Sequence, residues 1–219
     1  DNWVKLMSRF GGHHGFEYKS MLKTLDEAKD YKSLLTLSKT ILSTKDKNEM
    51  DDSDSYNKDP FCLGDLSYSE VFDYIVKVDD EYTKQALDQT VDVLGKALSV
   101  IGNDEFFLME DNVFTLEIHD REGLSPRSGI RNLMAVIKVF ADRIAAKDSK
   151  YVVDTIFKLP EDSALARRLK LYAVTIRPMI SIPEIKKLLF SVFDAIDPAT
   201  ITIGAEYDTV LQKCFGMLS

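Results

Sequence analysis

The feature that most constrains the fold is a long helical pattern from Ser67 to Gly102. Its apolar residues recur at steps of three and four, with one slip near the middle, which is the spacing of one helix face: Val71, Ile75, Val78, Tyr82, Leu87, Val91, Leu94, Leu98 and Ile101. Ser67 and Glu70 form a capping-box pattern at the start, and Gly102 supplies a stop. A helix of this length spans roughly 50 Å. We therefore expect one long helix at about residues 67–101, with other helices packed along it.

Composition limits the class of protein. The chain has 219 residues, 45% of them hydrophobic, which is ample for a core in one large domain or two small ones. No run approaches about 18 apolar residues, so we expect no transmembrane segment. Residues 1–110 carry 13 Lys/Arg and 22 Asp/Glu, whereas residues 111–219 carry 15 and 14. The acidic first half repels nucleic acid, and we therefore expect no sequence-specific nucleic-acid partner.

Most of the remaining sequence is also helical in pattern. A second long pattern covers Phe16–Leu42, and a third covers Ile130–Ile144. A weak point at Lys147–Ser149 separates this third helix from a shorter one that carries Val152 and Phe157. Later helices are expected to start at Asp162 as a cap and at Pro183 as a first residue, and the last carries Tyr207, Val210, Leu211, Cys214 and Leu218.

Three segments depart from the helical pattern. Residues 43–60 are polar and acidic without periodicity and predict a loop. An apolar run at 106–109, a short polar turn at 110–112 and an alternating segment at 113–118 predict a small β-hairpin at 105–118. It would lie against helices because two strands alone are marginal. Residues 200–203 predict a short strand or extended link. The expected fold is thus a mostly α, multi-helix bundle around the long helix, with a possible division into lobes near residues 103–125.

The N-terminal segment, residues 1–15, is set apart from a helical domain at 16–219. Four apolar residues share one face of a short helix: Trp3, Leu6, Met7 and Phe10. A glycine- and histidine-rich hinge follows at residues 11–15. This stub either docks on a partner or a membrane surface, or folds back on its own core. The chain begins at Asp1 without an initiator Met or signal-peptide pattern, so we expect an intracellular, soluble protein whose start was trimmed or naturally cut.

Residues that could carry chemistry do not converge in the sequence. His13 and His14 lie in the hinge and His119 ends the predicted hairpin, without carboxylates or cysteines at metal-ligand spacing. Cys62 and Cys214 have apolar neighbours and read as buried thiols without a disulfide pattern. Acids of the long helix precede lysines by four residues, as in exposed ion pairs. We expect no metal, no cofactor and no enzymatic activity.

The best candidate for a binding site is the helix start near residue 126. Arg127, Ser128 and Arg131 gather there, where unpaired backbone N–H groups and the helix dipole favour an anion. A capped helix start with surface arginines is the alternative. A second basic cluster is expected to be a solvated helix surface, or to meet an acidic partner or another copy of the chain: Arg167, Arg168, Lys170, Arg177, Lys186 and Lys187.

The layout of the whole chain resembles the internal head proteins of large tailed bacteriophages. The features that carry the resemblance are the missing Met, the stub from Asp1 to Gly12, and a polar segment, Gly64–Ser67, before a long helix. In that family a head protease trims the N-terminus, and the protein is packed in the capsid and ejected with DNA. The resemblance implies a location in the virion interior and assigns no functional residue.

These observations lead to three functional hypotheses. The first is a non-enzymatic structural or interaction protein that binds a protein partner or associates with itself. The second is a helical adaptor, which predicts an exposed apolar groove beside the long helix. The third is a hydrolase, which predicts a deep cleft lined by His119, a cysteine and two carboxylates.

Overall fold

The structure is a computed structural model that describes residues 15–46, 60–62, 71–101, 113–115, 126–176, 182–195 and 204–218. Its helices in chain order are α2 (Gly15–Glu27), α3 (Tyr31–Ile41), α5 (Asp80–Ile101), α6 (Pro126–Ile156), α7 (Ala164–Ile176), α8 (Ile182–Ala195) and α9 (Gly204–Leu218), with a 3-10 turn, η3, at Val113–Thr115. The prediction of a mostly α-helical bundle is confirmed. No helix in the described ranges is long and apolar enough to cross a lipid bilayer.

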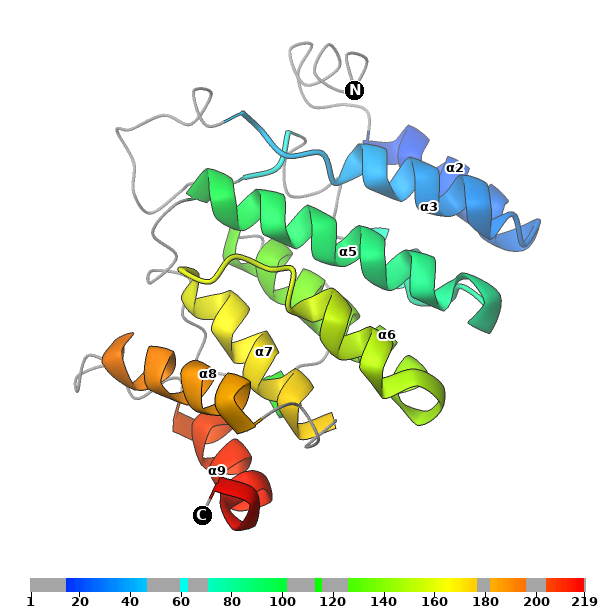
Figure 1. The fold of residues 1–219 in the computed structure, drawn as a ribbon. Helices are drawn as coiled ribbons and strands as arrows, with labels where there is room; N and C mark the ends of the chain where they lie inside the picture. The colour runs from blue at the N-terminus through cyan, green and yellow to red at the C-terminus, as the bar shows by residue number, and fades with distance from the viewer. Residues whose placement is uncertain are drawn as a thin grey trace.

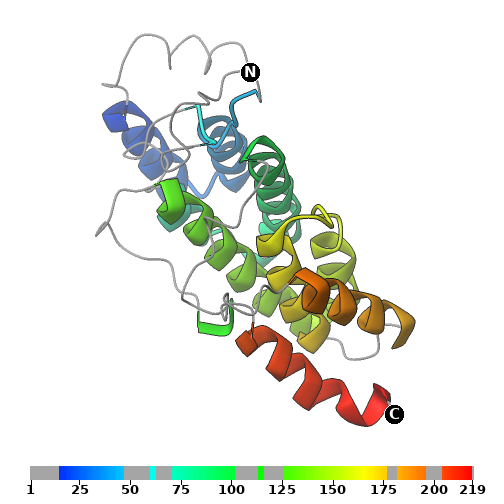
Figure 2. The same cartoon turned by 90° about the vertical axis from the view of Figure 1, so that its left-hand side faces the viewer.

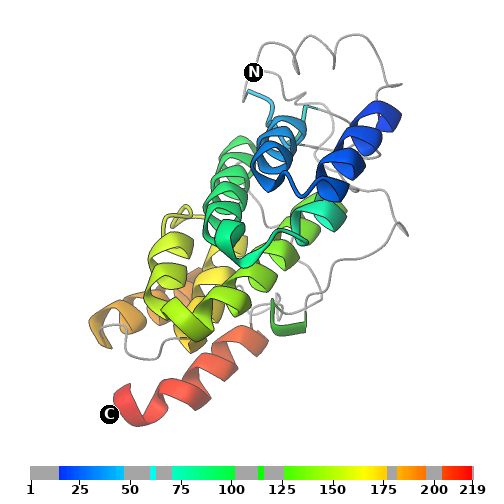
Figure 3. The ribbon, with the colours of Figure 1, turned by 90° about the vertical axis from the view of Figure 1, so that its right-hand side faces the viewer.

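The helices are stacked in nearly their order along the chain. Figure 1 shows α2 and α3 at one end of the molecule, α5 and α6 in the middle, and α8 and α9 beyond α7 at the other end. Views from the two sides show the same progression (Figures 2 and 3). Packing is most extensive between α5 and α6, while α3 packs on α5 and α7 packs on α6, α8 and α9. Most helices therefore pack against their neighbours in the chain, while α9 packs more on α7 than on α8.

Two hydrophobic clusters meet at α7. The larger cluster joins α2, α3, α5, α6 and one side of α7, where Leu165, Leu169 and Ala173 are buried. The smaller cluster lies between α7, α8 and α9 and contains Leu171 and Val174 of α7. Apolar packing on both sides leaves almost every residue from 164 to 174 buried. A helix enclosed in this way carries its polar side chains into the interior as well.

The long helix predicted at 67–101 is not continuous in the described residues. Residues 71–75 are helical, Val76 and Lys77 form a turn, and α5 begins only at Asp80. The acidic residues Asp80 and Glu81 lie in the first turn of α5, where the helix dipole favours negative charge. The apolar period continued through the turn because Val78 is itself buried, so the pattern alone did not reveal the break.

The pattern predicted at 16–42 is likewise divided into α2 and α3. Lys29 adopts a φ of 55°, and the Asp30 N–H donates to the Leu25 carbonyl at 2.9 Å, which is the hydrogen bond of a Schellman stop. The Asp30 carboxylate then accepts from the Ser33 N–H at 3.1 Å and caps α3. A side-chain hydrogen bond with Ser33, and secondarily this backbone hydrogen bond, lowers the pKa of Asp30. The two helices fold back on each other, which a single long helix would prevent.

The predicted weak point at 147–149 is confirmed. Asp148 has non-helical dihedral angles, φ −152° and ψ 70°, at a kink within α6. Its carboxylate accepts from the Tyr151 N–H at 3.1 Å and so caps the second part of the helix. The same carboxylate lies 2.6 Å from Lys84 Nζ on α5. The cap of α7 falls one residue later than predicted, because Ser163 Oγ, rather than Asp162, accepts from the Ala166 N–H at 3.0 Å.

The β-hairpin predicted at 105–118 is not seen. Residues 113–115 form the 3-10 turn η3, and the rest of that range lies outside the described residues. The Val113 N–H donates to the Glu206 side chain at 2.6 Å, so it is not available to a neighbouring strand. Phe114 packs its ring edge-on against Tyr172 of α7, with ring centroids 5.4 Å apart. The strand predicted at 200–203 and nearly all of the lobe division at 103–125 also lie outside the described residues.

Neither described cysteine is in a disulfide. Cys214 is buried in the smaller cluster, as predicted, and burial raises the pKa of its thiol. Cys62 is only half-buried and packs against the larger cluster. Both positions therefore fit the expectation of thiols that pack as small apolar side chains, although Cys62 is more accessible than predicted.

We predict that Leu94→Ala destabilises the protein. Leu94 is 0% exposed within the larger cluster, so its truncation removes apolar contacts and leaves a cavity. The expected loss in the free energy of unfolding is about 2–5 kcal/mol, measured by urea denaturation. Gln85→Ala, at an exposed position on the same helix, is the control and should change stability little. Equal losses in the two variants would contradict the packing of α5.

Candidate functional site: a groove along α5

A groove with a volume of about 710 Å³ runs along the C-terminal half of α5. α5 forms the floor, residues 44–46 form one wall, and residues 155–160 form the other. An adjoining hollow of about 350 Å³ extends it toward α3 and shares Thr44, Asp46, Asp92 and Lys96 with it. The lining of the groove comprises Thr44, Lys45, Asp46, Asp88, Val91, Asp92, Gly95, Lys96, Ser99, Val100, Thr155, Lys158 and Pro160.

The wall at residues 44–46 is held by a short antiparallel bridge. The Lys45 N–H donates to the Pro60 carbonyl and the Cys62 N–H donates to the Ser43 carbonyl, both at 2.8 Å. Thr44 and Phe61 are the bridged pair, and the Phe61 side chain is only 1% exposed in the core. The bridge brings together the two ends of the segment predicted as a loop at 43–60. One groove wall is therefore anchored to the hydrophobic core.

The charged groups of the groove contact one another. Asp88 accepts from the hydroxyl of Tyr151 at 2.5 Å and from that of Thr155 at 3.3 Å, and Lys158 Nζ lies 3.6 Å away. Asp92 pairs with Lys96 at 2.8 Å and with Lys39 at 3.8 Å. Burial, and secondarily the hydrogen bond to Asp88, raises the pKa of Tyr151 from 10.0 to about 12. The Tyr151 phenol thus stays protonated near neutral pH and donates to Asp88.

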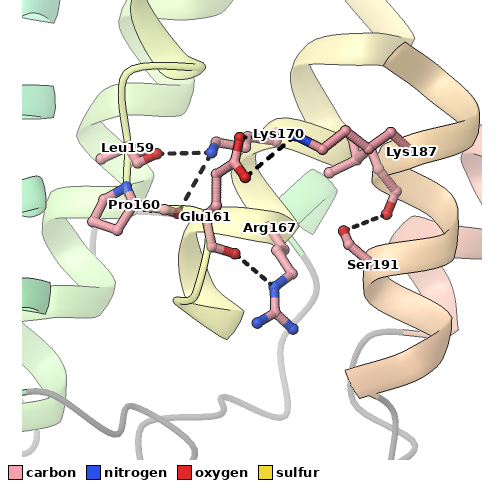
Figure 4. A network of polar contacts seen from close by, with 8 residues as sticks. Leu159, Pro160, Glu161, Arg167, Lys170, Lys187 and Ser191 are labelled. Atoms are coloured by element: carbon pink, nitrogen blue, oxygen red, sulfur yellow. Dashed lines mark hydrogen bonds and ion pairs between the residues drawn. The ribbon is translucent and has the colours of Figure 1, made fainter. Parts of the chain in front are cut away.

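The second basic cluster predicted from the sequence is not a solvated surface throughout. Lys170 is 4% exposed, and its Nζ donates to the carbonyls of Leu159 at 2.7 Å and Pro160 at 3.4 Å (Figure 4). Arg167 donates to the carbonyls of Glu161 and Asp162 at 3.0 and 2.9 Å. Burial lowers the pKa of Lys170. These side chains hold the turn between α6 and α7. Pro160 of this turn is part of the groove wall.

A smaller hollow of about 180 Å³ lies beside this turn, between α7 and α8. Lys187 of α8 reaches the Glu161 carboxylate at 3.3 Å, as Figure 4 shows. Arg167, Lys170 and Lys187 line the hollow together with Glu161 and Glu184. The acidic side chains offset the basic ones, so the hollow does not present a strongly positive surface to an anion.

Arg168 is the most deeply buried member of the basic cluster. Its Nε and Nη2 donate to Glu206 Oε1 of α9 at 3.0 and 2.8 Å, and both side chains are 0% exposed. Oε1 also accepts the Val113 N–H, so the carboxylate joins α7, α9 and η3. Within the described residues Glu206 Oε2 has no hydrogen-bond partner. A pattern of basic residues did not reveal this pair, because its acidic member lies 38 positions away in the sequence.

The sites predicted from the sequence lie elsewhere. Arg127 and Ser128 are in the first turn of α6, which begins at Pro126. Their side chains are not among those that the structure describes. Arg131 is half-buried on the next turn, and anion binding there stays a prediction. The stub residues lie outside the described residues: Trp3, Leu6, Met7 and Phe10. No group of three or more His, Cys, Asp or Glu side chains in the described ranges is arranged to hold a metal ion.

We predict that Arg168→Met costs about 3–5 kcal/mol of unfolding free energy, because it leaves the Glu206 carboxylate buried without a counter-charge. Replacing both partners, as Arg168→Met with Glu206→Gln, should recover part of this loss. Arg167→Met is a matched control, since its hydrogen bonds are at the surface. Chemical denaturation measures all three variants. An equally small loss of unfolding free energy in Arg167→Met and Arg168→Met would contradict a stabilising role for the buried ion pair.

The raised pKa of Tyr151 predicts a pH-dependent contribution to stability. Between the ordinary value of 10.0 and about 12, the unfolded chain loses the phenolic proton before the native state does, which favours unfolding. The stability of the wild type relative to Tyr151→Phe should therefore fall from about pH 9 to about pH 12. Denaturant titrations of both proteins across this pH range test whether the stability difference falls as the pH rises. A difference that is constant or rises with pH would show that the phenol is not held by Asp88.

Gly95→Ala is expected to stabilise the protein by about 0.5–1 kcal/mol, because alanine has the higher helix propensity. A Cβ at Gly95 would lie 3.8 Å from Leu159 Cδ2 and 4.0 Å from Pro160 Cδ, which are ordinary contacts. The melting temperature should rise by roughly 2–4 °C per kcal/mol. A lower melting temperature would mean that the far wall lies closer to α5 than described.

Known proteins give no guide to the function of the groove. No protein-family model, no curated protein and no solved structure matches the chain. The α5 groove is therefore the main candidate site, because it has a volume of about 710 Å³ and collects side chains from three separate segments.

Proposed function

We propose that this protein is a non-enzymatic structural or interaction protein that acts as a helical adaptor and presents the α5 groove to a protein partner. The groove itself carries the proposal: it has a volume of about 710 Å³, and its floor is α5, which packs extensively on α6. Its lining is more polar than the apolar groove predicted from the sequence. A polar lining suits a partner that exchanges hydrogen bonds and ion pairs with it.

The contacts among the groove side chains favour binding over catalysis. Asp88 holds two hydroxyl groups and a lysine, and Asp92 holds two lysines. Tyr151, with a pKa raised to about 12, is far from the range in which a general acid or base works best at neutral pH. The hydrolase hypothesis required a deep cleft lined by His119, a cysteine and two carboxylates, and of these the groove has the carboxylates. His119 lies outside the described residues, and neither Cys62 nor Cys214 is among the described residues that line the groove.

The charge of the groove favours a polypeptide partner over nucleic acid. Lys45, Lys96 and Lys158 are balanced there by three carboxylates: Asp46, Asp88 and Asp92. A polyanion binds through an excess of positive charge, which this lining does not provide. A polypeptide with side chains of both signs can exchange with the existing ion pairs without leaving any charge unpaired.

The sequence resemblance to internal head proteins gives the proposal a specific form. In this form the protein is a virion internal protein that is delivered with phage DNA, and its groove contacts another protein of the particle. Mass spectrometry of the native protein and of purified particles would test it. The expected result is the chain in the particle with a processed N-terminus; its absence from particles would remove the phage form and leave the adaptor proposal in place.

A groove-filling variant tests the adaptor proposal. Gly95→Trp puts a large side chain between α5 and the far wall, whereas Gly95→Ala fits without displacement. Proteins that co-purify from the natural source with the wild type and the Ala variant should be lost with the Trp variant. Gln85→Trp, at an exposed position of α5 outside the groove, is the control for an added tryptophan. The same set of partners with all variants would contradict a role for the groove.

A further inference from the structure

The wall of the groove at Thr44 has a backbone edge without a partner among the described residues. The two hydrogen bonds of the bridge join Lys45 to Pro60 and Cys62 to Ser43. Thr44 and Phe61 are thus a non-hydrogen-bonded pair, in which the N–H and C=O groups of each residue point away from the other strand. The Thr44 N–H and C=O therefore present one donor and one acceptor on the outer edge of a two-stranded ribbon.

This edge lies on the side of the groove. Figures 2 and 3, which view the molecule from opposite sides, both show residues 44–46 between residues 60–62 and the C-terminal end of α5. Thr44 also lines both the groove and the adjoining hollow. Its backbone groups point away from Phe61, on the edge of the ribbon that is open to another strand.

The dimensions of the groove fit an extended chain. The floor runs from Asp88 to Val100 of α5. At about 1.5 Å per helical residue this span is roughly 18 Å. An extended chain rises about 3.3 Å per residue, so about five residues would span the floor. Gly95 and Ser99 lie within the floor, and their small size leaves room for side chains of a ligand.

We propose that the groove binds an extended segment of a protein partner, which adds a strand to the ribbon by pairing with the Thr44 N–H and C=O. This inference rests on the proposed function and specifies the partner's conformation. A polypeptide backbone carries a donor and an acceptor on one edge at every second residue, which matches Thr44. The balanced lysines and aspartates of the lining select a segment with side chains of both signs.

The first experiment selects peptides on the intact protein. A display library of random peptides of about seven residues, enough to span the floor, is panned against the wild-type protein. Dissociation constants of the selected peptides are then measured by fluorescence anisotropy for the wild type, Gly95→Trp, Ser99→Trp and Gln85→Trp. Ser99 is an exposed floor residue and provides a second blocking variant if Gly95→Trp does not fold. Binding should weaken at least about tenfold in the blocking variants and stay unchanged in Gln85→Trp.

The second experiment tests strand pairing with the same peptides. Each backbone N–H is replaced in turn by N-methyl, which removes a donor. The peptide that is methylated at the residue opposite Thr44 should bind about tenfold more weakly. Peptides methylated at either neighbouring residue, whose N–H groups point away from Thr44, should bind as before. Equal effects at all positions would overturn strand addition.

The two experiments separate the inference from the function on which it rests. Loss of binding in the blocking variants with a uniform N-methyl scan keeps the groove as the docking site and overturns only the strand pairing. Selected peptides that bind the blocking variants as tightly as the wild type overturn both. A selection that yields no peptide also overturns both, and would point to a segment of this chain as the occupant of the groove.

Discussion

The enclosure of α7 is the constraint on which the rest of the structure depends. Apolar side chains pack on both sides of this helix, so it links the two hydrophobic clusters. Arg168 then lies in the interior, where an unpaired guanidinium would be very unfavourable. Glu206 supplies the counter-charge from α9 and also binds η3 through the Val113 N–H. One buried carboxylate thus determines how three elements dock.

The burial of α7 also shapes the groove. Lys170 extends from α7 to the carbonyls of Leu159 and Pro160, and this contact fixes the turn that follows α6. Pro160 and Lys158 of this region line the far wall of the groove. The near wall is fixed from the other end of the molecule, through the bridge between Thr44 and Phe61. Both walls of the groove are therefore held by contacts with the rest of the structure.

Local signals in the sequence predicted some features of the fold and missed others. The break at Asp148 was predicted from the weak point in the helical pattern at Lys147–Ser149, and the structure adds that Asp148 caps the second part of the helix. The breaks at 28–30 and 76–79 were not, because apolar residues keep a near-helical spacing across both turns. At Lys29 the stop is made by a residue with positive φ that is neither Gly nor Asn, so its sequence gives no warning.

The sequence by itself determined that the chain is mostly helical and which face of α5 is buried, because helical periodicity records the side of a helix that avoids water. Only the tertiary structure decided that Arg168 and Lys170 are interior, because burial on a second face depends on the helices that pack there. The groove also depends on how the helices pack. Its floor and walls come from three segments far apart in the chain, and its depth depends on the distances between them rather than on any local pattern.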